Sequence, residues 1–204
     1  MSSYILNHQG LCSYTLKLSG NHRNVLYKYL STVINHTVMD SEDRHMSLTC
    51  GVVLTLRDYI TIHHKLSIEN TISMIDCLSD QLTYLKTHNL GYYGLNLDDI
   101  LVIDDDKYII CDTSKLLNIS NDKLQINCLI KPCGFSSREM EHVLELPAKV
   151  DYRCIFYSIG LLVLFSLLQK RNSNIPRCLE GTKFEWFLQR CFKENPCERQ
   201  LLLI

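Results

Sequence analysis

The sequence predicts an α+β fold whose C-terminal part is mainly helical, and three segments carry this prediction. Residues 67–88 place apolar side chains at steps of three and four, which is typical of an amphipathic helix. Residues 154–168 (CIFYSIGLLVLFSLL) are apolar but shorter than the ~20 residues of a membrane span, so we expect a buried core helix. The apolar segments 100–103 and 108–111 flank an acidic turn and predict a short β-hairpin.

The first fifty residues give weaker signals. Residues 14–17 (YTLK) alternate like a strand, and residues 23–35 (RNVLYKYLSTVIN) look helical. Residues 51–56 (GVVLTL) predict a buried strand that ends near Leu56.

Composition is that of a compact globular protein. The chain has 204 residues, of which 46% are hydrophobic and 21% charged, enough for one large domain or two small lobes. A formal net charge of −1 gives no electrostatic argument for nucleic-acid binding. No basic start followed by an apolar stretch opens the chain, so we expect a cytoplasmic protein without a membrane partner.

Cysteine and histidine spacing gives no metal motif. The ten cysteines include no C-x-x-C pair, and the eight histidines form no H-E-x-x-H cluster. Most cysteines have apolar neighbours, where a thiol behaves as a small hydrophobe, so we expect reduced thiols and not disulfides.

Two carboxylates stand out in the middle of the chain. Residues 92–101 read YYGLNLDDIL, and Asp112 follows Asp99 by thirteen positions, just after the expected hairpin. This order resembles the catalytic centre of protein kinases, in which H-R-D-L-x-x-x-N precedes a β-hairpin and D-F-G. A hairpin with a solvated acidic turn is the alternative interpretation of the same stretch.

Three further segments extend the resemblance in the same order along the chain. Residues 67–88 resemble the kinase helix that leads into the catalytic loop, and residues 195–199 (NPCER) resemble the final D-P-x-x-R turn. Residues 157–160 (YSIG) match the second half of the D-x-W-S-x-G signature, whose Asp would fall at Ile155; the nearest acid is Asp151.

The resemblance covers roughly residues 48–204 and implies a protein-kinase-like fold. It implies a mainly helical C-lobe over residues 57–204 and a reduced, β-containing N-lobe over residues 1–56, because a complete N-lobe needs about eighty residues.

The same resemblance implies a degenerate catalytic loop. The positions that correspond to His, Arg, the catalytic Asp and the loop lysine are Tyr92, Tyr93, Gly94 and Asn96. Gly94 cannot accept a proton, and loss of a general base typically costs about 10²–10⁴-fold in rate. The resemblance therefore implies no catalytic residue at these positions.

Metal and nucleotide binding stay open. Asp99 stands at the place of the metal-binding Asn, and Asp112, with Thr113 and Ser114, at the place of D-F-G. Two carboxylates can hold Mg²⁺ together with the phosphates of ATP. Against this, no G-x-G-x-x-G loop is present. Lys17 corresponds to the phosphate-pairing lysine of V-A-I-K, although an exposed strand lysine is the simpler interpretation.

The resemblance also implies one long-range ion pair. In kinases the acid of the A-P-E motif pairs with the arginine of the D-P-x-x-R turn. Here Ser137-Arg138-Glu139 occupies the first place and Arg199 the second. We therefore expect the Glu139 carboxylate within about 4 Å of the Arg199 guanidinium.

Together these features indicate a pseudokinase that binds and regulates a protein partner such as a kinase. Some viruses encode truncated kinase-like proteins that inhibit host kinases, and the Ile-, Asn-, Tyr- and Lys-rich composition suits an AT-rich genome. The alternative is a weakly active serine/threonine kinase or another ATP-dependent transferase.

Overall fold

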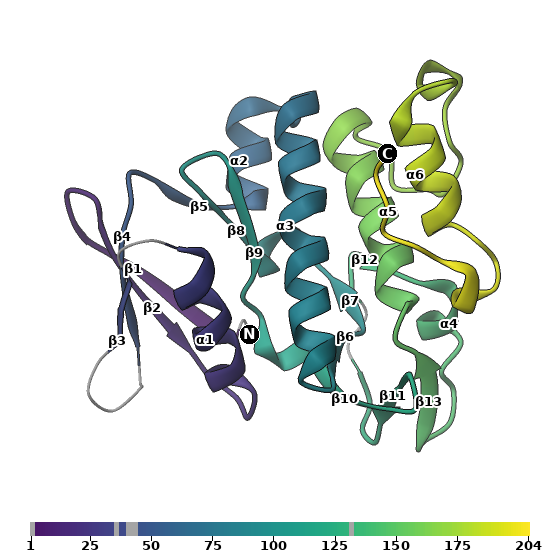
Figure 1. Ribbon diagram of the computed structural model, residues 1–204, viewed down its shortest axis with the longest axis horizontal. Helices are drawn as coiled ribbons and strands as arrows, with labels where there is room; N and C mark the ends of the chain where they lie inside the picture. The colour runs from purple at the N-terminus through teal and green to yellow at the C-terminus, as the bar shows by residue number, and fades with distance from the viewer. Residues whose placement is uncertain (1–2, 35–36, 40–44, 131–132) are drawn as a thin grey trace.

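The computed structural model describes residues 3–34, 37–39, 45–130 and 133–204, which form two unequal lobes (Figure 1). A small lobe of strands and one helix lies on one side, and the long helices of the large lobe stand on the other. All strand pairs are antiparallel, so the protein has an α+β architecture.

The small lobe is a four-stranded sheet that pairs in the order β1-β2-β4-β3, with helix α1 beside it. Its elements are β1 (Tyr4–Gly10), β2 (Ser13–Leu18), α1 (Arg23–Val33), β3 (Thr37–Met39) and β4 (Met46–Thr49). The Tyr27 hydroxyl of α1 accepts a hydrogen bond from the Leu18 backbone at 2.7 Å and ties the helix to the sheet. The predicted strand and helix are confirmed here; Asn35, the last residue of the predicted helix, lies outside the described residues.

The connection between the lobes differs from the prediction. Strand β5 (Val53–Thr55) pairs with the large lobe and not with the small sheet, and helix α2 (Leu56–His63) begins immediately after it. The Thr55 hydroxyl accepts a hydrogen bond from the Asp58 backbone and so caps α2. The predicted strand over residues 51–56 is therefore too long, and Leu56, its last residue, is a fully buried residue of α2.

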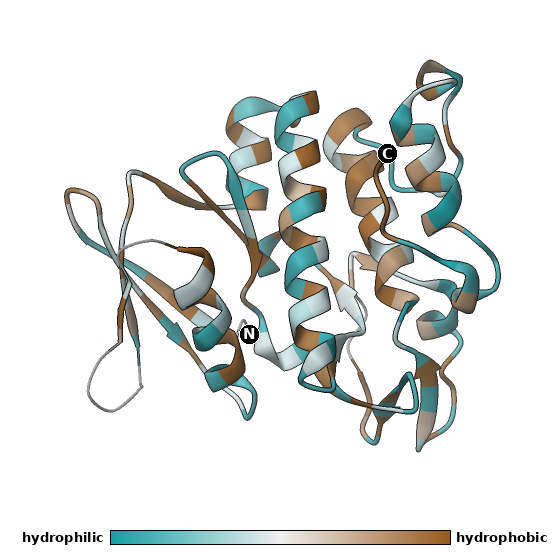
Figure 2. Ribbon diagram, viewed as in Figure 1, coloured by the Kyte–Doolittle hydropathy of each residue, from teal (hydrophilic) through white to brown (hydrophobic). Residues whose placement is uncertain are grey.

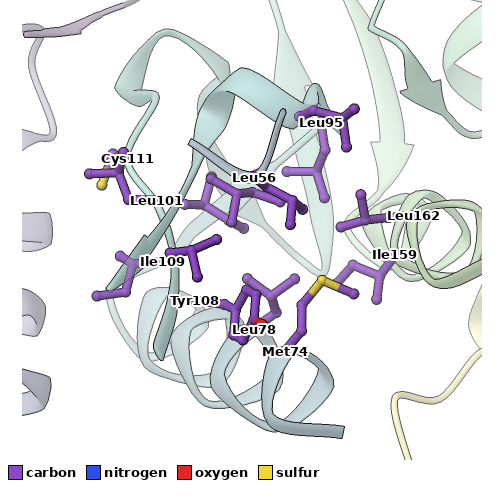
Figure 3. Packing of buried hydrophobic residues seen from close by; sticks show 14 of the residues in the cluster. Leu56, Met74, Leu78, Leu95, Leu101, Tyr108, Ile109, Cys111, Ile159 and Leu162 are labelled. Atoms are coloured by element: carbon purple, nitrogen blue, oxygen red, sulfur yellow. The ribbon is translucent and has the colours of Figure 1, made fainter. Parts of the chain in front are cut away.

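Helix α3 (Ile68–Thr87) forms as its periodicity predicts, with the Ser67 hydroxyl accepting a hydrogen bond from the Asn70 backbone. It packs on the hairpin of β8 (Ile100–Ile103) and β9 (Lys107–Ile110), which confirms the predicted hairpin with its second strand one residue earlier. Figure 3 shows Met74 and Leu78 of α3 among the hairpin side chains. The buried Gln81 amide bonds both backbone groups of Ile110 at 2.8 Å.

Helix α5 (Cys154–Leu168) has the predicted bounds, and its side chains are buried except for Phe156 and Leu168 at intermediate exposure. Figure 2 shows its hydrophobic colouring beside the mixed colouring of α3. A methyl group at Gly160 would lie 2.6 Å from the Phe192 ring, so glycine permits the close approach of α6 (Lys183–Cys191). No described helix combines the length and the apolar character that a membrane crossing requires.

The large lobe contains more strand than the predicted mainly helical lobe. Two further small sheets surround the helices, in the orders β13-β11-β10-β6 and β12-β7. Their strands are β6 (Leu90–Tyr92), β7 (Gly94–Leu95), β10 (Leu116–Ser120), β11 (Lys123–Ile126), β12 (Phe135–Ser136) and β13 (Ala148–Asp151). These strands are too short for a clear alternating pattern. In the turn between β10 and β11, Asn121 and Asp122 both adopt positive φ, as two-residue hairpin turns require.

The remaining helical segments are short. They are α4 (Arg138–Glu141) and the 3₁₀ turns η1 (Leu97–Asp99), η2 (Thr113–Lys115), η3 (Arg177–Leu179) and η4 (Pro196–Glu198). All ten cysteines lie in the described part of the chain and none forms a disulfide. Asp151, the acid nearest to the start of α5, accepts a hydrogen bond from the Arg153 backbone at 3.0 Å.

The ion pair expected between Glu139 and Arg199 is present, although sixty residues separate its partners. The guanidinium donates two bonds to the carboxylate, one of them at 3.0 Å from Nη1 to Oε2. It also donates to the carbonyl oxygens of Lys193 and Glu194 and lies over the ring of Tyr157. The Arg199 side chain is almost completely buried, so these contacts join the last segment of the chain to α4.

We predict that Glu139→Ala and Arg199→Ala each lower the free energy of unfolding by roughly 3–5 kcal/mol, because each change leaves the charge of the other residue buried and unpaired. The double variant should lose less than the sum of the two single losses, as urea denaturation would measure. Arg57→Ala is the control, because the Arg57–Asp98 pair is about half exposed, and its loss should cost less than about 1 kcal/mol. Additive losses at Glu139 and Arg199 would contradict the structural role of the pair.

Candidate functional site

The hairpin β8–β9 brings the two predicted carboxylates together. Asp99 ends the η1 turn just before β8, and Asp112 follows β9, so both lie at the open end of the hairpin. The Cys111 backbone donates a hydrogen bond to the Asp99 carbonyl at 2.8 Å, which extends the pairing of the hairpin to this point. Both carboxylates are buried, with 4% of each residue exposed.

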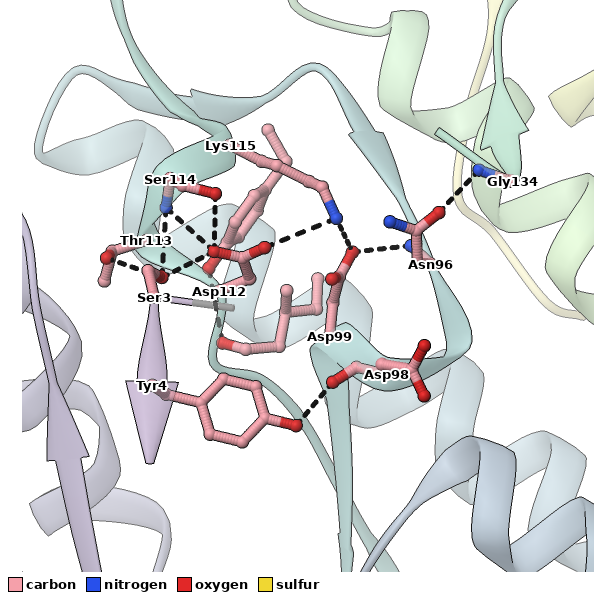
Figure 4. A network of polar contacts seen from close by, with 12 residues as sticks. Ser3, Tyr4, Asn96, Asp98, Asp99, Asp112, Thr113, Ser114, Lys115 and Gly134 are labelled. Carbon is pink, nitrogen blue, oxygen red and sulfur yellow. Dashed lines mark hydrogen bonds and ion pairs between the residues drawn. The ribbon is translucent and has the colours of Figure 1, made fainter. Parts of the chain in front are cut away.

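A lysine that the sequence analysis did not single out lies between the two carboxylates. The ammonium group of Lys115 bonds Oδ2 of Asp99 and lies 3.4 Å from Oδ2 of Asp112 (Figure 4). Lys115 is itself buried, with 6% exposed. We call Asp99, Asp112 and Lys115 the charge cluster. One feature of the sequence could have indicated this contact. Asp112 and Lys115 are three residues apart, and side chains with that spacing lie on the same side of a helical turn.

The second oxygen of Asp112 is occupied by hydroxyl and backbone groups. The Ser3 hydroxyl donates to Oδ1, and Ser114 donates to the same atom from its backbone at 3.0 Å and its hydroxyl at 2.7 Å. Thr113 contacts the Ser3 hydroxyl at 2.9 Å, and the Tyr4 hydroxyl donates to the Asp98 carbonyl. The start of the small lobe therefore contacts the site directly (Figure 4).

Asn96 holds a neighbouring segment against the loop. Its backbone N–H donates to Oδ2 of Asp99, and its side-chain oxygen accepts from the Gly134 backbone at 2.6 Å. Strand β12, just after Gly134, pairs with β7, which contains Gly94. Asn96 thus has a structural role that joins the loop to residues 133–136.

Gly94 lies in a space that has no room for a side chain. A β-carbon at Gly94 would lie 2.9 Å from both Cβ and Sγ of Cys133 and 3.2 Å from the Phe135 carbonyl oxygen. Cys133 therefore occupies the space that a proton-accepting carboxylate would need. Cys133 was not singled out from the sequence, because its closeness to Gly94 arises only when β12 pairs with β7.

The two tyrosines before Gly94, Tyr92 and Tyr93, are both buried. The Tyr92 hydroxyl donates to the Ile110 carbonyl at 3.2 Å, and burial raises the pKa of Tyr92 well above its ordinary value. Burial also raises the pKa of Tyr93 to about 12. With these raised pKa values neither phenol ionises near neutral pH, so neither can act as a general base there.

The two carboxylates have opposite pKa shifts. Burial raises the pKa of Asp99 to about 6, although Lys115 and the Asn96 backbone act to lower it. Burial also acts to raise the pKa of Asp112, but hydrogen bonds from Ser3 and Ser114, with the charge of Lys115, outweigh it and lower the pKa to about 2. Their different hydrogen-bond partners cause the difference.

Lys17, which the kinase resemblance assigned to phosphate pairing, lies on strand β2. It is exposed on β2 between the buried residues Leu16 and Leu18, and it faces the exposed Ile5 on β1. The described contacts of Asp99 and Asp112 do not include Lys17. The interpretation as an exposed strand lysine fits this placement. Within the described ranges, no three His, Cys, Asp or Glu side chains gather into a metal-binding group.

Neither a protein-family model nor a curated protein matches this chain. The argument about its function therefore rests on its own residues.

We predict that Gly94→Asp lowers the free energy of unfolding by about 1–3 kcal/mol, because the new side chain overlaps Cys133. Adding Cys133→Gly should restore part of the loss, since it removes two of the three closest atoms. Urea denaturation measures both effects. Equal stability of Gly94→Asp and the unmodified protein would mean that the space beside Gly94 is open.

A second prediction concerns the pH dependence of stability. The native pKa of Asp112, about 2, lies below the unfolded value of ~3.9, so its contribution is complete above about pH 4 and is lost as the pH falls through 2. The native pKa of Asp99, about 6, lies above the unfolded value, so its contribution decreases as the pH rises from about 4 to 6. Each effect amounts to about 3 kcal/mol, because a difference of one unit between the native and unfolded pKa corresponds to ~1.4 kcal/mol.

Urea denaturation between pH 2 and 7 separates the two carboxylates. Asp112→Asn should remove the stability loss below pH 4, and Asp99→Asn should remove the decline between pH 4 and 6. Two parallel pH profiles for these variants would contradict the opposite pKa shifts.

Proposed function

We propose that this protein is a catalytically inactive protein-kinase-like protein that acts by binding and regulating a protein partner. The order of its elements supports the proposal: α3 leads into the loop around Gly94, followed by the hairpin β8–β9 and Asp112. The Glu139–Arg199 contact also supports it, because nothing local in the sequence brings these residues together.

The observation that carries the proposal is the contact between Gly94 and Cys133. In protein kinases an Asp of the catalytic loop accepts the proton of the substrate hydroxyl. At the corresponding position this chain has Gly94, with Cys133 atoms 2.9 Å from where a β-carbon would be. The missing base by itself costs about 10²–10⁴-fold in rate. A loop packed in this way supports binding and not phosphoryl transfer.

A protein kinase is the partner class that we propose. The resemblance supplies the precedent, since some virus-encoded truncated kinase-like proteins inhibit host kinases, including those that phosphorylate translation initiation factor 2. The small lobe also exposes the apolar side chains of Ile5, Leu11 and Val38, which a partner can cover. We propose the cytoplasm as its compartment, because its ten cysteines form no disulfide.

The alternative is a weakly active serine/threonine kinase or another ATP-dependent transferase. One observation favours it: Asp99 and Asp112 are both retained and both contact the same cation. This alternative requires phosphoryl transfer without a side-chain base at position 94.

We predict that the purified protein, incubated with radiolabelled ATP and Mg²⁺, transfers no phosphate to itself or to generic protein substrates. When titrated against purified serine/threonine kinases, it should lower the substrate phosphorylation rate of at least one of them near equimolar concentration. An unrelated protein of similar size is the control for the second measurement.

Two outcomes would overturn this proposal. Phosphate transfer by the unmodified protein, abolished by Asp112→Ala, would establish the transferase alternative. If the protein lowers the phosphorylation rate of no kinase in the panel, protein kinases are not its partners.

A further inference from the structure

We propose that the Lys115 ammonium is the built-in cation of the Asp99–Asp112 pair. It neutralises the two carboxylates in place of a divalent metal ion, and the site binds no such ion while Lys115 is present. The proposal goes beyond the proposed function, because it depends only on the charge cluster and not on the relation to kinases.

The position of the ammonium is the first argument. Two buried carboxylates repel each other, and a cation that contacts both relieves this repulsion. The Lys115 ammonium bonds Oδ2 of Asp99 and lies 3.4 Å from Oδ2 of Asp112. An ammonium group is a compact charge with three donors, so it can contact one oxygen of each carboxylate, as a bridging metal ion would.

The second argument is that three of the four carboxylate oxygens, both of Asp112 and Oδ2 of Asp99, already have partners. Oδ1 of Asp112 accepts hydrogen bonds from Ser3 and Ser114, and Oδ2 of Asp99 also accepts one from the Asn96 backbone. Mg²⁺ requires near-octahedral oxygen ligands at ~2.0–2.1 Å and usually keeps several waters. The cluster residues are only 4–6% exposed, so a hydrated ion does not fit beside the ammonium.

The third argument is charge. Two carboxylates and one ammonium leave a net charge of about −1 within the cluster, in place of the −2 available to a metal ion. A divalent ion would either have to displace the Lys115 ammonium or lie beside it, and two positive charges in contact repel each other strongly in a buried environment. The residues that the kinase resemblance assigned to Mg²⁺ therefore do not fit a metal ion while Lys115 is present.

The consequence is a contact between the lobes that needs no ligand. Lys115 holds Asp112 in place, and Asp112 accepts the hydrogen bond of Ser3 at the start of the small lobe. In this arrangement the lobes are held together permanently, with no dependence on ATP or metal.

Removal of Lys115 tests the proposal. Lys115→Ala leaves two adjacent carboxylates without a cation, so millimolar Mn²⁺ or Mg²⁺ should raise its melting temperature by at least about 2 °C. The melting temperature of the unmodified protein should not change. Lys123→Ala is the matched control: Lys123 pairs with a single carboxylate, Asp151, at 3.1 Å, so its removal should give no response to metal.

A second measurement uses only the unmodified protein, so that the test stands even if Lys115→Ala does not fold. Acetylation of Lys115 by an amine-reactive ester, read by mass spectrometry, should stay low with and without Mn²⁺, because the buried ammonium is not displaced. Stabilisation of the unmodified protein by Mn²⁺, a rise in Lys115 acetylation with Mn²⁺, or a folded Lys115→Ala variant that ignores metal would each overturn the proposal.

Discussion

The buried contact of Lys115 with Asp99 and Asp112 is the interaction on which the centre of this protein depends. Charged groups inside a protein are tolerated only when they are paired and hydrogen-bonded, because desolvation costs several kcal/mol per ion. Because of that constraint, the cluster needs hydrogen-bond partners in addition to its own ion pairs. The structure takes them from three parts of the chain: the loop at Asn96, the turn at Ser114 and the first strand at Ser3. The cluster therefore positions the hairpin and both lobes at once.

The contacts of the same region support the proposal that this protein does not transfer phosphate. Chemistry on a hydroxyl group needs a proton acceptor, room for substrate and charges that the substrate can neutralise. Here Cys133 fills the space beside Gly94, Asn96 binds Gly134, and Lys115 neutralises part of the carboxylate charge. Each of these contacts stabilises the folded chain, and each takes up a group that catalysis would use.

The charge cluster and the Glu139–Arg199 pair stabilise different long-range connections. The charge cluster joins the hairpin to the small lobe, whereas Glu139 and Arg199 join α4 to the end of the chain. Between them the apolar helix α5 packs against α3 and α6, and Gly160 allows the close approach of Phe192. Polar contacts therefore specify which segments meet, and apolar burial supplies most of the driving force.

The sequence by itself determined the elements whose local pattern is strong. The period of α3, the unbroken apolar run of α5 and the hairpin around residues 104–106 were all readable from local patterns. The Glu139–Arg199 contact was expected only from the resemblance to protein kinases. The short strands β6, β7 and β10 to β13, and the start of α2 at Leu56, were not predicted. Only the tertiary structure decided the chemistry of the site: Lys115 reaches Asp99 because the hairpin folds back, and Cys133 reaches Gly94 because β12 pairs with β7. Contacts of this kind depend on strand pairing between distant segments, and no local pattern of residues records that pairing.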